Sequence, residues 1–261
     1  MSFGINTAAS PAQEQPTFDH IVVFGDSLSD MGNAGRFSNG PVWVEQLADK
    51  LHVTLRPSDH GGENFAIGGA RLDPKSGPDS LRAQVDRFLQ RKALPEGRTL
   101  YIVWGGSNDI FAALDERKAL AQLDTAAESL KSIVADLVQN GAQDLLVPNL
   151  ADVGMTPEVR AQGRKAVEEA RRLTEHLNKT VDNDLAALNS SASNTFKVHR
   201  LDVWSLAEQA RKQPSSFGLR NVTSPCKRLR RCDGHLFWDD IHPTTEGHAR
   251  LAAAALDALD H

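Results

Sequence analysis

Residues 20–30 read HIVVFGDSLSD, an apolar run that stops at a glycine, an acid and a serine. A continuous apolar run of this length is typical of a strand that is buried on both faces. The polar residues behind it fit two structures. In the first, Ser27 only caps a strand-to-helix turn. In the second, the turn presents Ser27 as a nucleophile at the end of a sheet.

The rest of the chain alternates similar runs with helical patterns. Further strands are predicted at 99–106, 144–150 and 196–204, with a weak, short one at 53–55. Apolar residues at helical spacing predict helices at 42–52, 80–92, 119–139, 157–188, 205–212 and 243–259. Strands separated by helices indicate an α/β fold with a mostly parallel central sheet of about five strands. No linker divides the chain, so we expect a flexible leader at 1–17 and a single domain over 18–261.

Composition excludes several function classes. The 261 residues carry a net charge of −5, whereas a nucleic-acid-binding protein is usually basic overall. No apolar run reaches the ~18 residues that a membrane-spanning helix needs. The N-terminal stretch lacks the basic and apolar regions of an intact signal peptide.

The chain has two cysteines, Cys226 and Cys232, in the loop-like stretch TSPCKRLRRCDGH. No His or Cys cluster at zinc-finger spacing accompanies them, so we expect no metal site. Their spacing and loop context favour a local disulfide, which would imply an oxidising compartment and a periplasmic or secreted protein. Two free thiols in a cytosolic protein are the alternative.

Four polar or glycine-rich stretches lie near predicted strand ends. In chain order they are GDSLSD, NFAIGGA, GGSND and FWDDIHPT. In parallel sheets ligands bind outside the carboxyl ends of the strands, so these stretches are expected to meet there. Each alone is weak, because serine, glycine pairs and Asn-Asp also serve as caps and turns. Their joint occurrence in this order is specific.

Together these stretches contain the parts of an acyl-transfer site. Ser27 is the candidate nucleophile and His242 the candidate base, with Asp239 spaced to orient the imidazole. Candidate oxyanion donors are the backbone N–H groups of Ser27 and of Gly68 or Gly69. Glycine at these positions lets the main chain come close to the substrate. The side-chain amide of Asn108 is another candidate donor.

These stretches resemble the sequence blocks of the GDSL family of lipases and esterases, also called SGNH hydrolases. GDSL (25–28) matches the first block, NFAIGGA and GGSND are similar to the second and third, and DDIH contains the Asp-x-x-His of the last. VPNLADVGMTP (147–157) and a cysteine pair before the last block resemble a branch of bacterial lipolytic enzymes. The similarity spans about residues 20–250.

The resemblance implies a flavodoxin-like three-layer α/β/α fold and a Ser-His-Asp hydrolase that needs no cofactor or metal. Carried over to this sequence, it assigns Ser27, His242 and Asp239 to the triad. Gly69 and Asn108 then complete the oxyanion hole. We therefore expect a serine-dependent ester hydrolase that acts on lipid esters, such as lysophospholipids, with acyl transfer to an alcohol as a further option. Acetylated carbohydrate is the alternative substrate, and a catalytically dead binding module is the alternative from a different class.

Several residues carry two interpretations. Ser107 in GGSND is a weak rival nucleophile, because the closing glycine of a Gly-x-Ser-x-Gly elbow is missing. The four cations of CKRLRRC either attract anionic head groups near the site or form a solvated charge run. Four polar residues near the strand ends are expected to hydrogen-bond the turns: Asp26, Asp30, Asn33 and Asp109. Three aromatic residues fit an acyl pocket or core packing equally well: Phe37, Trp43 and Phe65.

Overall fold

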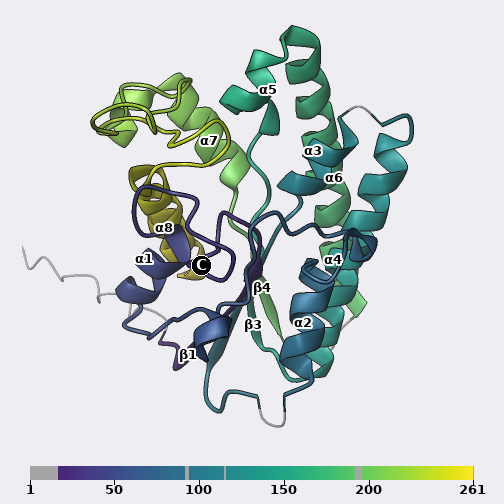
Figure 1. Ribbon diagram of the computed structural model, residues 1–261. Coiled ribbons are helices and arrows are strands. Elements are labelled where there is room, and N and C mark those ends of the chain that lie inside the picture. Colours follow the sequence, from purple (N-terminus) through teal and green to yellow (C-terminus); the bar gives the residue numbers. More distant parts are fainter. Residues whose placement is uncertain (1–16, 92–93, 115, 192–195, 261) are drawn as a thin grey trace, which may run out of the picture.

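The computed structural model of the protein describes residues 17–91, 94–114, 116–191 and 196–260 (Figure 1). Four parallel strands form its sheet in the order β1-β2-β3-β4. The strands are β1 (His20–Gly25), β2 (Thr99–Trp104), β3 (Asp144–Leu146) and β4 (Lys197–His199). The register places Gly25 beside Trp104, so β1 and β2 end together at their carboxyl ends. The predicted leader lies almost wholly outside the described residues.

The predicted short strand at 53–55 is wrong, and a later segment takes its place beside β1. The N–H of Val53 donates to the carbonyl of Ala48 at the end of a helix, so this segment is bound to that helix and not to the sheet. Residues 63–67 instead run parallel to β1, with Phe65 N–H donating to Val23 O and Ile67 N–H to Gly25 O. The pairing of this segment with β1 is regular only at the bridge between Asn64 and Val23, and Asn64 also forms a bridge with Pro57 on its other side. The sheet therefore has four strands where we expected about five.

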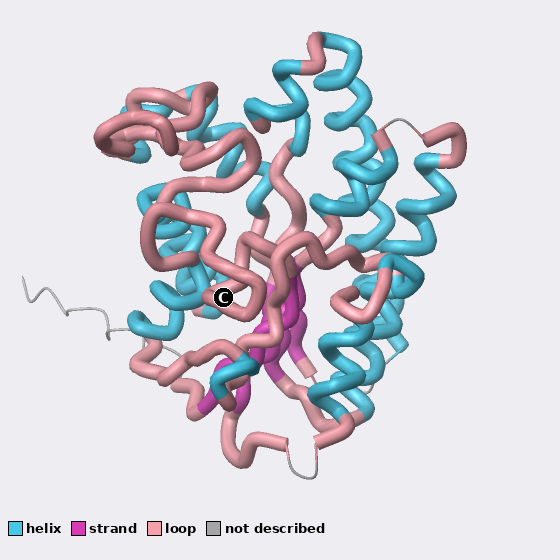
Figure 2. Tube along the Cα trace, viewed as in Figure 1, coloured by secondary structure: helices cyan, strands magenta, loops and turns pink. Residues whose placement is uncertain are grey.

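Helices cover both faces of the sheet and make three layers (Figures 1 and 2). On one side α1 (Trp43–Lys50) packs against α8 (Thr245–Leu259). The other side holds α2 (Leu81–Leu89), α3 (Ser107–Ala113), α4 (Ala119–Gln139) and α6 (Arg164–Ser191). The remaining helices are α5 (Pro157–Ala161), α7 (Val203–Lys212) and the short 3-10 helices η1 (Ser58–His60), η2 (Pro74–Ser76), η3 (Val153–Met155) and η4 (Pro214–Phe217). No helix within the described ranges is long and apolar enough to cross a membrane.

The long helix predicted over 157–188 is broken into α5 and α6. The break falls at Gly163, whose φ of +98° is a left-handed conformation that ends a helix. The apolar stripe continues through the break, which is why the sequence pattern does not reveal it. Another difference is that α7 begins at Val203, capped by Asp202, and shortens the strand predicted over 196–204.

The core consists of the strands and the apolar faces of the flanking helices. Phe24 of β1 stacks on Phe65 and meets Phe88 of α2 edge to face, which fixes the segment 63–67 and α2 against the first strand. Trp43 and Phe65 are buried in this core. Core packing is therefore their role, and the acyl pocket proposed for them lies elsewhere.

Candidate active site

Ser27 sits at the tip of a tight turn directly after β1. The Asp26 carbonyl accepts the N–H groups of Ser29 and Asp30, both at 3.0 Å, and the Asp26 carboxylate accepts the N–H of Leu28 at 2.9 Å. Burial raises the pKa of Asp26 to about 6. The turn starts at Gly25, where a Cβ atom would lie 2.9 Å from the Trp104 carbonyl. The close approach of β2 therefore demands glycine at this position.

A buried glutamine, which sequence reasoning missed, clamps the same turn. The side chain of Gln84, from α2, accepts the N–H of Gly25 and donates to its carbonyl, each at 2.9 Å. Gln84 is fully buried, so both bonds form in a low-dielectric interior. The end of β1 is thereby held rigidly, and Ser27 with it. A glutamine inside an otherwise apolar helical stripe was the only sequence signal.

The structure brings Ser27, His242 and Asp239 into one hydrogen-bonded line. The Ser27 Oγ lies 2.8 Å from His242 Nε2, and His242 Nδ1 lies 2.9 and 3.0 Å from the two carboxylate oxygens of Asp239. Because a carboxylate only accepts, Nδ1 carries the ring hydrogen and Nε2 is left to accept from the serine. This is the geometry in which an imidazole can take the proton of an attacking hydroxyl.

The neighbours of Asp239 and His242 fix the charge of the carboxylate and the orientation of the imidazole. Burial raises the pKa of Asp239, but hydrogen bonds from the His242 ring and from the backbone N–H groups of His242 and Ile241 outweigh it and lower the value to about 2. Asp239 is therefore ionised at neutral pH. The ring of Phe37 lies 5.1 Å from the imidazole, which restricts the rotation of His242.

The two glycines of the second block have different positions. The N–H of Gly68 donates to the Asp30 carboxylate at 2.9 Å and is therefore engaged within the protein. Gly69 has a φ of +82°, a conformation that glycine adopts without strain. This difference favours Gly69 over Gly68 as the source of a backbone donor.

Asn108 lies in the first turn of α3 and lines the pocket together with Ser27. Its Nδ2 donates to the Ala70 carbonyl at 2.9 Å, which fixes the amide beside the Gly69 loop. An amide nitrogen carries two hydrogens, so one remains to meet a ligand. Ser107, the rival nucleophile, lines the same pocket, but His242 bonds Ser27 and not Ser107.

The acidic and amide side chains near the strand ends hold the loops, as their expected turn-bonding role requires. The Asp30 carboxylate accepts from the N–H groups of Gly32, Asn33 and Ala34. The Asn33 amide donates to the carbonyls of Asn64 and Ala66. Asp109 accepts from the N–H groups of Leu72 and Asp73, and burial raises its pKa to about 6. These bonds tie the Ser27 turn to the Gly69 loop.

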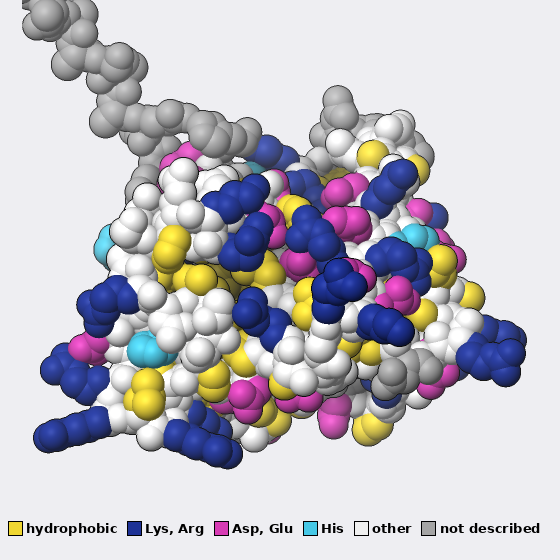
Figure 3. Space-filling view, turned by 90° about the horizontal axis from the view of Figure 1, so that it is seen from above, with side chains coloured by type: hydrophobic (Ala, Val, Ile, Leu, Met, Phe, Trp, Pro, Cys, Tyr) yellow, Lys and Arg dark blue, Asp and Glu magenta, His cyan; other side chains and the backbone are white. Residues whose placement is uncertain are grey.

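A large apolar pocket opens beside Ser27. It encloses about 1050 Å³, including the open space at its mouth. Figure 3 shows a hollow in the upper face with hydrophobic side chains in its walls. One wall is a face of α7 with helical spacing: Val203, Leu206, Ala207 and Ala210. Sequence reasoning found the helix but not this role, because an amphipathic pattern does not say whether protein or ligand covers the apolar face.

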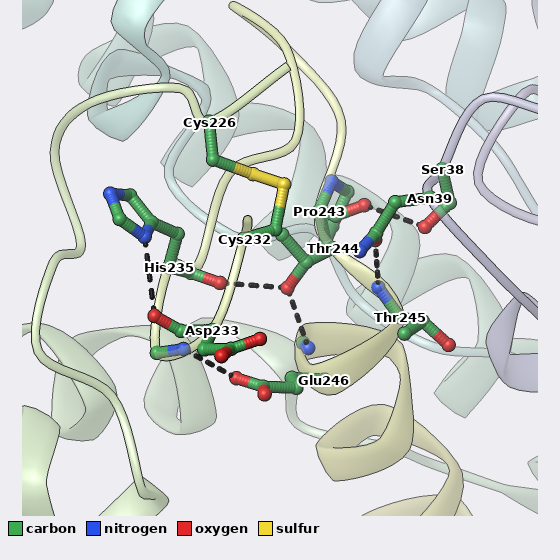
Figure 4. The surroundings of a disulfide bond; sticks show 12 residues. Ser38, Asn39, Cys226, Cys232, Asp233, His235, Pro243, Thr244, Thr245 and Glu246 are labelled. Carbon is green, nitrogen blue, oxygen red and sulfur yellow. Dashed lines mark hydrogen bonds between the residues drawn. A yellow bond between two sulfur atoms is a disulfide. The ribbon is translucent and has the colours of Figure 1, made fainter. Parts of the chain in front are cut away.

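The structure contains the disulfide between Cys226 and Cys232, with the Cα atoms 5.2 Å apart (Figure 4). Its loop is joined to the segment that carries Asp239 and His242. The N–H of Cys226 donates to the Phe237 carbonyl at 3.1 Å, and that of Lys227 to the Trp238 carbonyl at 2.7 Å. Among the described residues, no cluster of His, Cys, Asp and Glu could hold a metal ion.

Comparison with known proteins places nearly the whole chain in one family. The family model for GDSL-like lipases and acylhydrolases matches residues 21–255. A phosphatidylcholine-sterol acyltransferase from Aeromonas hydrophila is 29% identical over 95% of this chain and 92% of its own length. A GDSL esterase/lipase of Arabidopsis thaliana is 26% identical over 88% of this chain and 83% of its own.

Solved structures have the same fold. A catalytic mutant of an acetylxylan esterase from Geobacillus stearothermophilus superposes with a TM-score of 0.58 at 16% identity, over 94% of this chain and 96% of that one. A member of the lipolytic G-D-S-L family from Veillonella parvula gives a TM-score of 0.56 at 13% identity, over 91% and 96%. At these identities the likeness concerns the fold.

Proposed function

The chain belongs to the GDSL-like lipase/acylhydrolase family and is a carboxylic ester hydrolase, and from this premise we propose that it cleaves lipid esters through an acyl-enzyme on Ser27. The observation that carries the proposal is the joint geometry of the serine and the pocket. The Ser27 Oγ lies 2.8 Å from His242 Nε2, and Ser27 is itself part of the lining of the apolar pocket.

In the first half of the reaction the Ser27 Oγ attacks the ester carbonyl carbon. Its proton passes to His242 Nε2 as the new O–C bond forms. Asp239, ionised at neutral pH, stabilises the resulting imidazolium through Nδ1. The oxyanion accepts hydrogen bonds from the N–H groups of Ser27 and Gly69 and from the Asn108 amide. When the C–O bond to the alcohol breaks, the alcohol takes the proton from Nε2.

In the second half water releases the acid. A water molecule gives its proton to Nε2 while its oxygen attacks the acyl carbon of the Ser27 ester. The bond to Oγ then breaks, and the proton returns to the serine. An alcohol that enters in place of water would receive the acyl group, and the similarity to a phosphatidylcholine-sterol acyltransferase supports this second outcome.

The pocket supports lipid esters over acetyl esters. Its lining is mostly apolar and comes from several separate segments, whereas an acetyl group would contact only the few residues next to Ser27. The apolar face of α7 offers a surface along which a longer chain can lie and leave water. The alternative function is that of an acetyl esterase acting on carbohydrate. The solved acetylxylan esterase resembles this chain in fold, but the pocket does not favour an acetyl group.

A non-catalytic binding module would lack a triad member or an oxyanion donor. Ser27, His242, Asp239, Gly69 and Asn108 are all present, and the triad is hydrogen-bonded. The chain is therefore better described as an enzyme, in agreement with its family.

We also propose that the cations between the cysteines attract anionic head groups. The disulfide supports a periplasmic or secreted location.

The experiment is a panel of p-nitrophenyl esters of increasing acyl length. We expect kcat/KM to rise from acetyl to medium or long chains, and Ser27→Ala to abolish turnover on all of them. Ala207→Phe would place a ring in the pocket and lower the rate on long chains more than on acetyl. Gln209→Phe, at an exposed position of the same helix, is the matched control. A preference for acetyl, or equal losses at every length in Ala207→Phe, would refute the lipid-ester assignment.

A further inference from the structure

The loop closed by the disulfide, residues 226–232, is here called the basic loop. It encloses Lys227, Arg228, Leu229, Arg230 and Arg231, all of which are exposed. Leu229 is 54% exposed, and the only other large exposed hydrophobic residue among those described is Leu120, at 39%. An apolar side chain at the tip of a short loop, with cations on both sides, has the composition of a surface that meets a charged, partly apolar partner.

The basic loop is ordered before any partner arrives. The disulfide closes it, and the N–H of Leu229 donates to the Cys226 carbonyl at 2.7 Å, which forms a turn with Leu229 at its end. The ammonium of Lys227 lies 4.1 Å from the centre of the Trp238 ring. Because these contacts already fix the backbone, the loop loses little conformational entropy on binding.

Two of its four cations form no ion pair with the described residues. Arg231 pairs with Asp233 at 2.6 Å, and Lys227 stacks on Trp238. No ion pair involves Arg228 or Arg230 in the part of the chain that the structure describes. The chain as a whole carries −5, so this concentration of positive charge is local and opposite in sign to the molecule.

The basic loop stands beside the mouth of the pocket. The residues that its backbone contacts, Phe237 and Trp238, directly precede Asp239, and Phe237 itself lines the pocket. In Figures 1 and 2 the loop region lies with α7 at the upper end of the molecule, the face from which Figure 3 is drawn. A surface that touched the basic loop would therefore come close to the opening that leads to Ser27.

We propose that the basic loop docks the enzyme on anionic lipid bilayers. Arg228 and Arg230 pair with lipid phosphates, and Leu229 inserts at the level of the head groups. The inference rests on the proposed lipid-ester activity for its purpose, because docking presents the pocket to its substrate. It extends the head-group proposal from a single substrate molecule to a membrane surface.

The experiment measures vesicle binding separately from catalysis. The Ser27→Ala protein, which cannot consume the lipid, is sedimented with vesicles of phosphatidylcholine alone or mixed with phosphatidylglycerol. We expect binding to the mixed vesicles only, weakening as salt is raised. Arg228→Gln with Arg230→Gln should weaken it roughly 30-fold, at about fivefold per charge. Leu229→Ser should weaken it roughly fivefold, because partial insertion is lost.

Matched controls come from the other exposed leucine. Arg117→Gln with Lys118→Gln removes two exposed cations just before α4, and Leu120→Ser removes an exposed leucine in its first turn. These variants should bind vesicles like the parent protein. In the background with Ser27 intact, the basic-loop variants should hydrolyse a neutral, soluble short-chain ester, which has no anionic head group, at the parental rate.

Three results would overturn the docking proposal: equal binding to neutral and mixed vesicles, unchanged binding in the basic-loop variants, or retention on a sulfated polysaccharide without vesicle binding. Failure of the proposed function would look different. In that case the wild-type protein would bind the mixed vesicles and turn over no ester.

Discussion

Acid should destabilise this protein through one buried histidine that is not part of the Ser27, His242 and Asp239 site. His248 lies on α8 with none of its side chain exposed, and neither ring nitrogen has a hydrogen-bond partner among the described residues. Burial is the main cause that lowers its pKa from 6.5 to about 3, and the electrostatic effects of His242 and Arg36 add to it. The folded protein therefore keeps the ring neutral under conditions in which the unfolded chain protonates it.

The sign and size of the effect follow from proton linkage. Since the unfolded state binds the extra proton, the folded state loses stability as pH falls below 6.5, and the loss stops only below about pH 3. Each pH unit in that window costs up to about 1.4 kcal/mol. Between pH 7 and pH 4 the contribution is about 3 kcal/mol, a large part of the stability of an ordinary domain.

The assay is urea unfolding at pH 7, 6, 5 and 4 with the disulfide intact, on the wild type and His248→Leu. The variant should resist acid better, and the difference in unfolding free energy should change by about 3 kcal/mol across this range. His60→Gln, at an exposed position, controls for the loss of a histidine. A difference that stays constant from pH 7 to pH 4 would refute the reasoning from burial.

Three further predictions follow from the site and its supports. Asp239→Asn should lower kcat by roughly 10³–10⁴ with little change in KM, since the ring hydrogen of His242 is no longer held on Nδ1; a loss below about tenfold would contradict this role. Asn108→Ala should lower kcat by roughly 10²–10³ through the loss of one oxyanion donor, and steady-state kinetics with an unchanged KM would distinguish this from weaker binding. Cys226→Ser with Cys232→Ser should lower the free energy of unfolding, measured in urea, by roughly 2 kcal/mol, because the unfolded chain regains the freedom of a short loop. A difference near zero would show that the disulfide does not stabilise the fold.

Much of the fold could be predicted because the signals are local. The apolar run before Gly25 is β1, and the stripe over 119–139 is α4 with the expected bounds. The errors arose where the deciding interaction is distant in sequence. Residues 63–67 pair with β1 through backbone bonds that no side-chain pattern records, whereas 53–55 looks more strand-like and pairs with nothing in the sheet.

The candidate site shows the same division. Four short stretches predicted Ser27, Asp239 and His242 as catalytic residues, because the residue types that perform acyl transfer are few, and the structure brings these three side chains together. Gln84 was missed because its partner, Gly25, lies 59 positions away, and the pocket wall of α7 was missed because an empty apolar face and a packed one have the same sequence pattern. Spatial partners, and not residue types, were the missing information.

The most direct test is covalent labelling with an organophosphate that mimics the ester transition state, followed by mass spectrometry of the digested protein. The reagent should add one group to Ser27, and His242→Ala should slow that reaction strongly. A label on Ser107, or none at all under conditions in which the protein cleaves an ester, would contradict the central claim that the serine after β1 is the nucleophile.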